Sequence, residues 1–318
     1  MCTAVTFQPN DLYFGRTLDY EISYMEQVTI TPRNYPFHFR RMPAIKHHYA
    51  MIGMASMQDG YPLYFDAVNE KGLGMAGLAF VHSAKYLAEA PDADNLASFE
   101  LIPWILCQCA SVQDARQLLK RMRITDDAFR EDLPPSPLHW IIADKREAIT
   151  VEAVADGVKV YDNPIGVLTN EPPFPKQLQA WELYGHLSAR TPENIRNPYS
   201  RGMGTLGLPG DLTSTSRFVR AAFVKKHSLC DDAELSAVNQ FFHILGSVAQ
   251  PRGCCETDQG KFEKTIYTGC CNATKGIYYY TTYENSRITA VNMFKENLDG
   301  EAPVYYCLTS ADQILRQN

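Results

Sequence analysis

The sequence has no apolar run that could cross a membrane. A spanning helix needs about 20 consecutive, mostly apolar residues, and no stretch of the 318 residues comes close to this. The first residues, Met-Cys-Thr-Ala-Val-Thr-Phe, contain neither a basic segment nor a long apolar one, which argues against a signal peptide. We therefore expect a cytoplasmic protein.

The sequence also lacks a basic segment. The formal net charge is -6 at pH 7, from 30 Lys and Arg against 36 Asp and Glu. Proteins that bind nucleic acid or anionic membrane surfaces concentrate Lys and Arg in one run or on one face. We therefore expect neither nucleic acid nor a membrane as a partner.

Cysteine occurs nine times, but without the spacing of a metal site or a disulfide framework. The adjacent pairs Cys254-Cys255 and Cys270-Cys271 are not CxxC zinc knuckles, and His47-His48 is not at ligand spacing on a helix. An odd number of cysteines in a cytoplasmic protein argues against a set of disulfides. We expect no metal site, and we expect most of these thiols to be small core residues.

The expected elements follow the order strands, helices, strands, helices, strands. Short alternating or apolar runs between turn residues predict strands, whereas longer runs with capping signals predict helices. The expected strands are 3–7, 12–18, 28–31, 49–55, 73–80, 138–143, 148–153, 158–161, 265–268, 276–283 and 287–293. The expected helices are 99–109, 111–122, 175–187, 214–227 and 232–248, and 196–211 is a glycine-rich loop. This order fits one α+β domain over residues 1–318, with two sheets between helical layers.

Cys2 is the first candidate for chemistry. If Met1 is removed, the α-amino group of Cys2, with a pKa of about 8, can serve as the base for its own thiol. The thiolate is the reactive form of cysteine, and a nearby cation stabilises it. The alternative is an ordinary buried cysteine on the first strand.

Arg16 and Asp19 lie beside Cys2 if the first two strands form a hairpin. Pro9-Asn10-Asp11 is a turn signal between residues 3–7 and 12–18. A cation and an anion at this place could set the protonation of the thiol and hold the α-amine. The alternative is a surface ion pair at the end of a hairpin.

Several motifs follow one another along the chain: Met1-Cys2-Thr3-Ala4, Phe14-Gly15-Arg16-Thr17-Leu18-Asp19, NEKGLGMAGL at 69–78, LHW at 138–140, GVLTN at 166–170, GLPGD at 207–211, SRFVR at 216–220 and GIYYYTTYEN at 276–285. Taken in this order, they resemble the choloylglycine hydrolase family, which holds bile salt hydrolases and penicillin V acylases. Each motif alone is weak evidence for the family, but together the motifs extend over nearly the whole chain in one order. The resemblance implies a four-layer αββα sandwich of N-terminal-nucleophile hydrolase type.

The resemblance also implies roles for five residues. Cys2 would be the nucleophile that attacks an amide carbonyl, with Arg16 and Asp19 beside it. Asn170 would donate its side-chain amide to the oxyanion, a contribution often worth roughly 10²–10³ in rate. Arg217 matches the family's second active-site arginine, and its place in the first turn of an expected helix, where a cation opposes the helix dipole, is a small independent hint. The alternatives are a turn residue for Asn170 and a solvated side chain for Arg217.

Position 79 departs from the family pattern. Bile salt hydrolases usually carry Asn after the Gly-Leu that is Gly77-Leu78 here, and penicillin V acylases tend to carry Tyr, whereas this chain has Ala79. We expect Ala79 to contribute only its backbone N–H to an oxyanion. Thr17, where Asn is common in the family, is a smaller departure.

The glycine-rich loop contains Tyr199-Ser200-Arg201-Gly202-Met203-Gly204. In the family, this loop carries either Gly-x-Gly or Ser-Arg-Gly, and the second is associated with taurine conjugates. Because a guanidinium suits a sulfonate, one hypothesis is that Arg201 favours taurine over glycine. An exposed arginine on a flexible loop is an equal alternative.

A steroid needs an apolar slot, because apolar side chains dominate small-molecule pockets. Met25, Phe65 and Ile141 are candidates to line it, together with Met57 and Phe80. For each of them, an ordinary place in the core is the favoured alternative.

The function that the resemblance implies is hydrolysis of glycine- or taurine-conjugated bile acids through a thioester on Cys2. The reaction needs no cofactor or metal, and family members are commonly homotetramers. The nearest alternative is a penicillin V or acyl-homoserine-lactone acylase on the same fold. The alternative from another class is a non-catalytic steroid-binding homologue, which only Ala79 supports and which the joint presence of the five catalytic candidates argues against.

Overall fold

Two β-sheets lie face to face in the computed structural model of the chain, which describes residues 1–193, 200–309, 311 and 313–318. Neighbouring strands within both sheets are antiparallel. The six-stranded sheet has the spatial order β12 (Val167–Leu168), β1 (Cys2–Phe7), β2 (Tyr13–Tyr20), β13 (Lys264–Asn272), β14 (Ile277–Thr282) and β15 (Thr289–Asn292). The eight-stranded sheet has the order β11 (Gly157–Asp162), β10 (Ala148–Val154), β9 (Leu138–Ala143), β6 (Gly74–Ala79), β5 (Tyr61–Asn69), β4 (Met51–Gln58), β3 (Gln27–Thr31) and β16 (Val304–Cys307).

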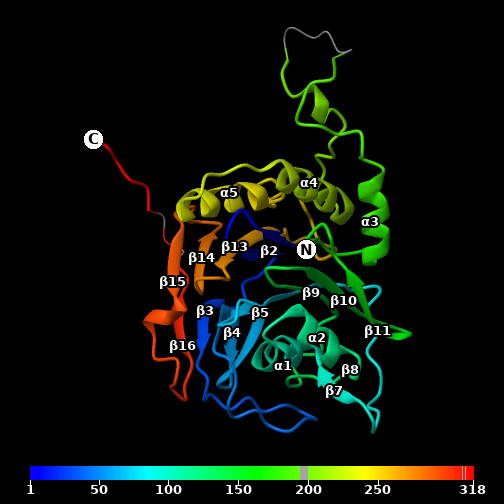
Figure 1. Ribbon diagram of the computed structural model, residues 1–318, viewed down its shortest axis with the longest axis vertical. Helices are drawn as coiled ribbons and strands as arrows, with labels where there is room; N and C mark the ends of the chain where they lie inside the picture. The colour runs from blue at the N-terminus through cyan, green and yellow to red at the C-terminus, as the bar shows by residue number, and fades with distance from the viewer. Residues whose placement is uncertain (194–199, 310, 312) are drawn as a thin grey trace.

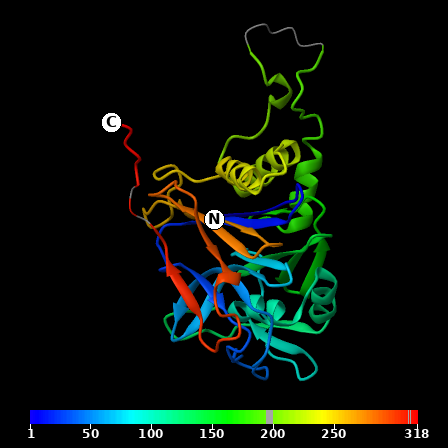
Figure 2. The ribbon, with the colours of Figure 1, turned by 60° about the vertical axis from the view of Figure 1, so that its left-hand side comes forward.

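Helices cover the outer face of each sheet (Figure 1). α4 (Ser214–His227) and α5 (Glu234–Gly246) lie over the six-stranded sheet, with α3 (Phe174–Glu182) beside α4. α1 (Leu101–Gln108) packs against β5 and β6, and α2 (Val112–Leu119) lies near β11. The turned view in Figure 2 shows the same succession of helices, sheet, sheet and helices. This is the four-layer αββα sandwich that the resemblance implied.

The predicted hairpin at the start of the chain is confirmed. β1 and β2 pair with Cys2 opposite Leu18 and Ala4 opposite Arg16. β2 also pairs with β13, so the hairpin lies inside the six-stranded sheet rather than at its edge. All six residues of β1 are buried, because one face of this strand meets the other sheet and the opposite face meets α4 and α5. The hairpin therefore carries Cys2 and Arg16 into the interior of the sandwich.

The hydrophobic core has two parts. One lies between the two sheets and beneath α4 and α5, and Cys270 and Cys271 belong to it. The other lies beneath α1 and α2, and Cys107 and Cys109 belong to it. All nine cysteines are unpaired, and the prediction that thiols serve as core residues is confirmed for these four.

The sequence patterns did not predict β5, β16 and the parallel pair β7 (Asp94–Ala97) and β8 (Met122–Thr125). Pro62 stands near the start of β5, where proline argues against a strand, but it lies near the end of the ladder, opposite Met57. The helix expected to reach residue 122 ends at Leu119, because the following residues pair with β7. Tertiary pairing thus overrides the local helical pattern.

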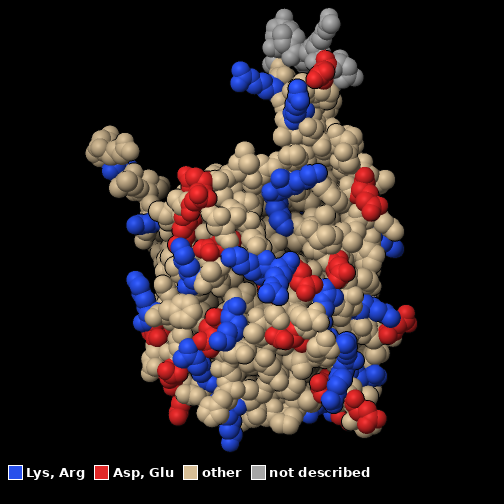
Figure 3. Space-filling model, viewed as in Figure 1, with Lys and Arg blue, Asp and Glu red and all other residues tan. Residues whose placement is uncertain are grey.

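The expected loop 196–211 contains a short 3-10 turn, Met203–Thr205, and its residues 196–199 lie outside the described residues. No helix in the described ranges is long and apolar enough to cross a membrane. On the face shown in Figure 3, basic and acidic side chains are interspersed. This face therefore differs from the single-sign stripe that nucleic-acid-binding surfaces present.

Candidate active site

Cys2 is the first residue of β1 and has only 4% of its surface exposed. Its Sγ accepts a hydrogen bond from Nη2 of Arg16 on the neighbouring strand. Its backbone N donates to Oδ1 of Asn170 at 2.8 Å, and its backbone O accepts from Nη1 of Arg217 at 2.5 Å. The structure therefore brings three of the predicted catalytic residues into direct contact with Cys2.

Arg16 is buried between the two sheets. Its Nη1 donates to two backbone carbonyls of the opposite sheet, that of Phe65 at 3.2 Å and that of Gly77. Burial alone would lower the pKa of Arg16, but the ionisable Cys2 thiol and the Asp66 carboxylate raise it above its usual range. Arg16 is thus a permanent cation beside the thiol, and such a cation stabilises a thiolate.

Arg217 is the second buried cation of the site. It lies in the first turn of α4, and its Nη1 also donates to Oγ1 of Thr3 at 2.7 Å, while its Nε donates to the backbone O of Leu212 at 3.0 Å. No carboxylate in the described part of the chain forms an ion pair with it, and burial lowers its pKa. A fully buried guanidinium with neutral partners is costly to desolvate, so its place here indicates a role in the site.

Asn170 follows β12 and is held in one orientation. Its Oδ1 accepts from the backbone N of Cys2 and from Nη2 of Arg217, the latter at 2.7 Å. Its Nδ2 donates to the backbone O of Ala79 at 2.9 Å. A side-chain amide has two hydrogens on nitrogen, so the second hydrogen of Nδ2 can be donated to a substrate atom.

The carboxylate of Asp19 is held by hydroxyl groups. Oδ1 accepts from Oγ1 of Thr265 at 2.6 Å, and Oδ2 accepts from Oγ1 of Thr17 at 3.1 Å. The N-terminal nitrogen of Met1 instead donates to the backbone O of Asp19 at 2.5 Å and to Oε1 of Glu263 at 3.1 Å. It is thus the backbone of Asp19, rather than its carboxylate, that contacts the N-terminus while Met1 is present.

Ala79 is the last residue of β6, and its backbone reaches the site. Its carbonyl is the group that contacts Asn170. The expected donation from the N–H of Ala79 to an oxyanion stays a prediction.

Three aromatic side chains lie together, and one of them, Phe65, binds Arg16 through its backbone O. The ring of Tyr24 lies 5.2 Å from that of Tyr20 and 5.9 Å from that of Phe65, measured between centroids. Burial and Tyr20 raise the pKa of Tyr24, and the nearby Cys2 raises it further. Phe65, a predicted lining residue, therefore contacts Arg16 through its carbonyl and Tyr24 through its ring.

The other two predicted lining residues, Met25 and Ile141, have no described contact with the cluster around Cys2. Met25 is 76% exposed and lines a surface cavity of about 360 Å³ together with Lys264 and Ile266. Ile141 is fully buried in the core between the sheets. Ile141 thus occupies the core position that was its favoured alternative.

Arg201 is exposed on the segment that extends beyond α3 and α4 at the top of Figure 1. Its backbone O accepts from Oγ of Ser200 at 3.1 Å. Tyr199, the first residue of the loop motif, lies outside the described residues. None of the described contacts connects Arg201 with the cluster around Cys2.

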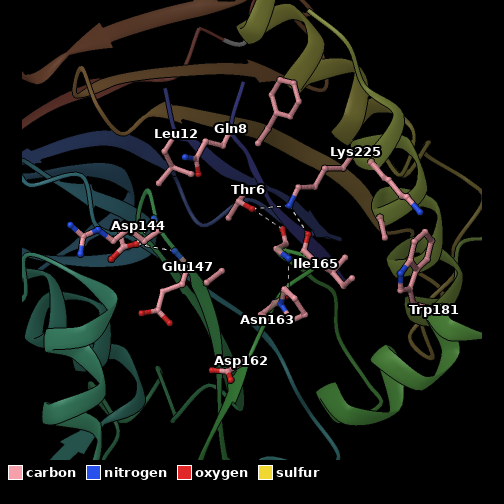
Figure 4. Close-up of a pocket in the computed structure, with 17 residues that line it drawn as sticks. Thr6, Gln8, Leu12, Asp144, Glu147, Asp162, Asn163, Ile165, Trp181 and Lys225 are labelled. Carbon is pink, nitrogen blue, oxygen red and sulfur yellow. Dashed lines mark hydrogen bonds between the residues drawn. The ribbon is translucent and has the colours of Figure 1, made fainter. Parts of the chain in front are cut away.

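A cavity of about 810 Å³ lies at the opposite end of β1 from Cys2 (Figure 4). Thr6 and Gln8 line it together with Trp181 and Lys225, and Figure 4 shows the amine of Lys225 reaching Thr6 and Ile165. None of the predicted catalytic residues lines this cavity. Among the described residues, no group of three His, Cys, Asp or Glu side chains could hold a metal ion.

Comparison with known proteins shows the family of the chain. A family model described as linear amide C-N hydrolases, choloylglycine hydrolase family, matches residues 2–306. The chain belongs to this family. It is 51% identical to the bile salt hydrolase/transferase of Lactiplantibacillus plantarum over 100% of both chains. It is 38% identical to the conjugated bile acid hydrolase of Lactobacillus gasseri over 96% of this chain and 100% of the relative. As a choloylglycine hydrolase family member, the protein is a hydrolase that acts on linear amide C–N bonds.

Solved structures of similar proteins have the same fold. A mutant of the conjugated bile acid hydrolase from Clostridium perfringens superposes with a TM-score of 0.92 at 35% identity, covering 100% of each chain. The penicillin V acylase from Agrobacterium tumefaciens gives a TM-score of 0.78 at 19% identity, covering 96% of this chain and 90% of that one. The second likeness shows the N-terminal-nucleophile fold alone.

The sequence analysis missed Thr3 and Thr265, and it noted Thr17 without giving it a role. Thr3 binds Arg217, and Thr17 and Thr265 bind Asp19. Strand alternation places the side chain of Thr3 on the face of β1 opposite Cys2. The alternation pattern could therefore have identified Thr3 as a polar residue on that face. Thr265 lies 246 residues from its partner along the chain, and no local pattern links the two.

Proposed function

We propose that the chain is a bile salt hydrolase, which cleaves the amide bond of glycine- or taurine-conjugated bile acids with Cys2 as the nucleophile. The observation that carries this proposal is the pairing of the Cys2 thiol with Arg16, beside a backbone nitrogen that becomes an amine when Met1 is removed. The names of the relatives, bile salt hydrolase/transferase and conjugated bile acid hydrolase, support the substrate class.

Removal of Met1 is the first step of the proposed mechanism. While Met1 is present, the nitrogen of Cys2 is a peptide N–H that donates to Asn170 and has no basic lone pair. After removal it is a primary amine that can take the thiol proton. Oδ1 of Asn170 is placed to accept a hydrogen from this amine and so to keep it near the thiol.

The thiolate then attacks the amide carbonyl carbon, and the carbonyl oxygen becomes an oxyanion. The free Nδ2 hydrogen of Asn170 donates to this oxyanion. The amine of taurine or glycine leaves with the proton held by the α-amine, and the bile acid remains on Sγ as a thioester. Water, deprotonated by the same α-amine, then hydrolyses the thioester and restores the thiol. These steps need no cofactor.

Tyr20, Tyr24 and Phe65 are the proposed apolar contact for the steroid. Their rings lie together, and the backbone O of Phe65 binds Arg16. Aromatic groups with an apolar face suit a flat hydrophobic ligand. Met25 lies one residue beyond Tyr24 and is exposed enough to contact a ligand.

The taurine preference of Arg201 is a finer part of the proposal. Arg201→Ala should lower the ratio of taurocholate to glycocholate hydrolysis, because it removes a guanidinium that suits a sulfonate. Arg190→Ala is a matched control, since Arg190 is an exposed arginine of the same extended segment. An unchanged ratio in Arg201→Ala would remove this part and leave the hydrolase proposal intact.

The first experiment compares substrates after intact-mass confirmation that Met1 is gone. Purified wild-type protein, Cys2→Ala and the thiol control Cys230→Ala are incubated with taurocholate, glycocholate and penicillin V. Release of taurine or glycine by the wild type and the control, but not by Cys2→Ala, is the expected result. Turnover of penicillin V alone would show a penicillin V acylase instead, an alternative that Ala79 does not exclude. No turnover of any substrate would favour the steroid-binding homologue.

We further propose that the protein acts in the cytoplasm as a homotetramer. The support for this part is the resemblance to a family whose members are commonly homotetramers, and Leu206, which is 70% exposed, is available for a contact between copies. Light scattering in solution should give four times the mass of one chain. A mass of one chain at working concentration would contradict the tetramer.

A further inference from the structure

His139 and Glu152 form a fully buried pair behind Asn170. They lie opposite each other on the adjacent strands β9 and β10. Nδ1 of His139 lies 3.3 Å from Oε1 of Glu152, and Nε2 lies 2.9 Å from the backbone O of Thr169. Neither side chain takes part in the reaction steps described above.

The two partners of the imidazole determine which hydrogens it needs. A carbonyl oxygen only accepts hydrogen bonds, so Nε2 of His139 must carry the hydrogen that it donates to Thr169. Nδ1 then faces a carboxylate oxygen, and that contact is attractive only if a hydrogen lies on Nδ1 or on Oε1. Without it, a nitrogen lone pair would oppose a carboxylate at a fully buried place, which is costly. The pair must therefore hold one proton between its two residues.

The remaining contacts of Glu152 favour the same assignment. Oε1 also accepts from the backbone N of Phe174, the first residue of α3, at 2.8 Å. Oε2 has no hydrogen-bond partner among the described residues. A carboxylate that is ionised and half unpaired would carry a large desolvation cost, which a shared proton reduces.

The pair contacts both backbone segments that present Asn170. Thr169, whose carbonyl is bound, immediately precedes Asn170. Phe80, which immediately follows Ala79, stacks on His139 with centroids 4.3 Å apart and an interplanar angle of 6°. The backbone O of Ala79 in turn accepts from Nδ2 of Asn170 at 2.9 Å. A displacement of His139 would therefore move both the backbone of Asn170 and the acceptor that orients its amide.

We propose that His139 and Glu152 are positioning residues that share one proton and hold Asn170 in the orientation from which it donates to the oxyanion. This inference rests on the role of Asn170 in the proposed function. Because that donation is made in the transition state, loss of the pair should lower kcat and leave KM nearly unchanged.

Glu152→Gln is the test variant, because it is nearly isosteric but carries no proton to share while its oxygen accepts from Phe174. A misplacement of about 1 Å can cost about 10²-fold, so we expect kcat to fall by about tenfold or more. Glu100→Gln is the matched control, since Glu100 is also a fully buried carboxylate but binds the backbone of Ala97 and Arg40, away from the site. It should leave kcat unchanged.

A double-mutant cycle separates positioning from a general loss of structure. In protein that already carries Asn170→Ala, Glu152→Gln should have little further effect on kcat, because both changes act through the same amide. A full additional loss in that background would overturn the proposal. The cycle uses whichever of taurocholate, glycocholate and penicillin V the wild type hydrolyses.

A measurement without substrate keeps this inference separate from the proposed function. In ¹⁵N-labelled protein at pH 7, a hydrogen should lie on Nε2 of His139, and the Nδ2 resonance of Asn170 should shift in Glu152→Gln but not in Glu100→Gln. An unprotonated Nε2, or an unmoved Asn170 resonance, would overturn the proposal. Absence of turnover with both spectral results present would refute the proposed function instead.

Discussion

The amine of Lys225 should make the stability of the protein depend on pH between 7 and 10. Lys225 lies on α4, and its Nζ donates to Oγ1 of Thr6 at 2.9 Å and to the backbone O of Ile165 at 2.5 Å (Figure 4). The described residues place no carboxylate in ion-pair contact with it. Burial lowers the pKa of Lys225 to about 8 from the ordinary value of 10.5.

The sign of this pH dependence follows from which state, folded or unfolded, binds more protons. Between pH 8 and 10.5 the unfolded chain keeps the proton on Lys225 while the native protein loses it. The unfolded state then binds more protons, so the free energy of unfolding rises with pH. Integrating the difference from pH 7 to pH 10 at about 1.36 kcal/mol per unit gives a gain of about 2.5 kcal/mol from this one amine.

The assay is urea-induced unfolding of the wild type and Lys225→Met at several pH values from 7 to 10, with thiols kept reduced. The variant loses two hydrogen bonds, but that cost does not vary with pH and cancels when the two pH profiles are subtracted. Lys226→Met is the control, because Lys226 is the exposed neighbour over the ring of Trp181. If the wild type and Lys225→Met show parallel pH profiles, the reasoning about a desolvated ammonium is refuted.

Two further changes test the interior around the thiol. Asp66→Asn removes a buried carboxyl group that lies near Arg16, so the Arg16 cation is less neutralised beside the thiol, and Cys2 should react faster with iodoacetamide at pH 7; a slower reaction would contradict this. Gly15→Ala would place a Cβ 2.0 Å from the backbone O of Gly269, and the forced displacement should lower the free energy of unfolding by about 3 kcal/mol. Urea unfolding measures this effect, and an unchanged midpoint would show that the strands can separate at no cost.

The turn and strand patterns predicted the hairpin, whereas no local pattern predicted that Asn170 and Arg217 lie beside Cys2. The turn at 9–11 separates two strand runs, and hairpin register then brings Arg16 close to Cys2. Asn170 and Arg217 lie 168 and 215 residues from Cys2 along the chain. No periodicity or spacing connects residues so far apart, because the contacts depend on which sheets and helices pack together. Only the resemblance to a family linked them to the site beforehand.

Polar residues inside the sandwich were the least predictable feature. Asp66 lies on a strand that the sequence patterns did not predict. A single Asp in an apolar run is normally interpreted as a residue that faces solvent. In the structure its two oxygens accept from the hydroxyls of Tyr267 at 2.8 Å and Tyr278 at 2.7 Å, both on the other sheet. A buried carboxylate is tolerated only when such partners converge on it, and the convergence is a property of sheet packing. The pair of His139 and Glu152 was hidden for the same reason.

In the proposed mechanism, Ala79 leaves Asn170 as the side-chain donor to the oxyanion. An Asn side chain at this position would add two N–H donors, whereas Ala79 offers only backbone groups. Its carbonyl occupies one Nδ2 hydrogen of Asn170 at 2.9 Å, so Asn170 keeps one hydrogen for the substrate. Arg217 binds Oδ1 of the same amide at 2.7 Å, and a cation at the oxygen of an amide polarises its N–H groups into stronger donors. The buried charge of Arg217 thereby strengthens the one donor that Asn170 retains.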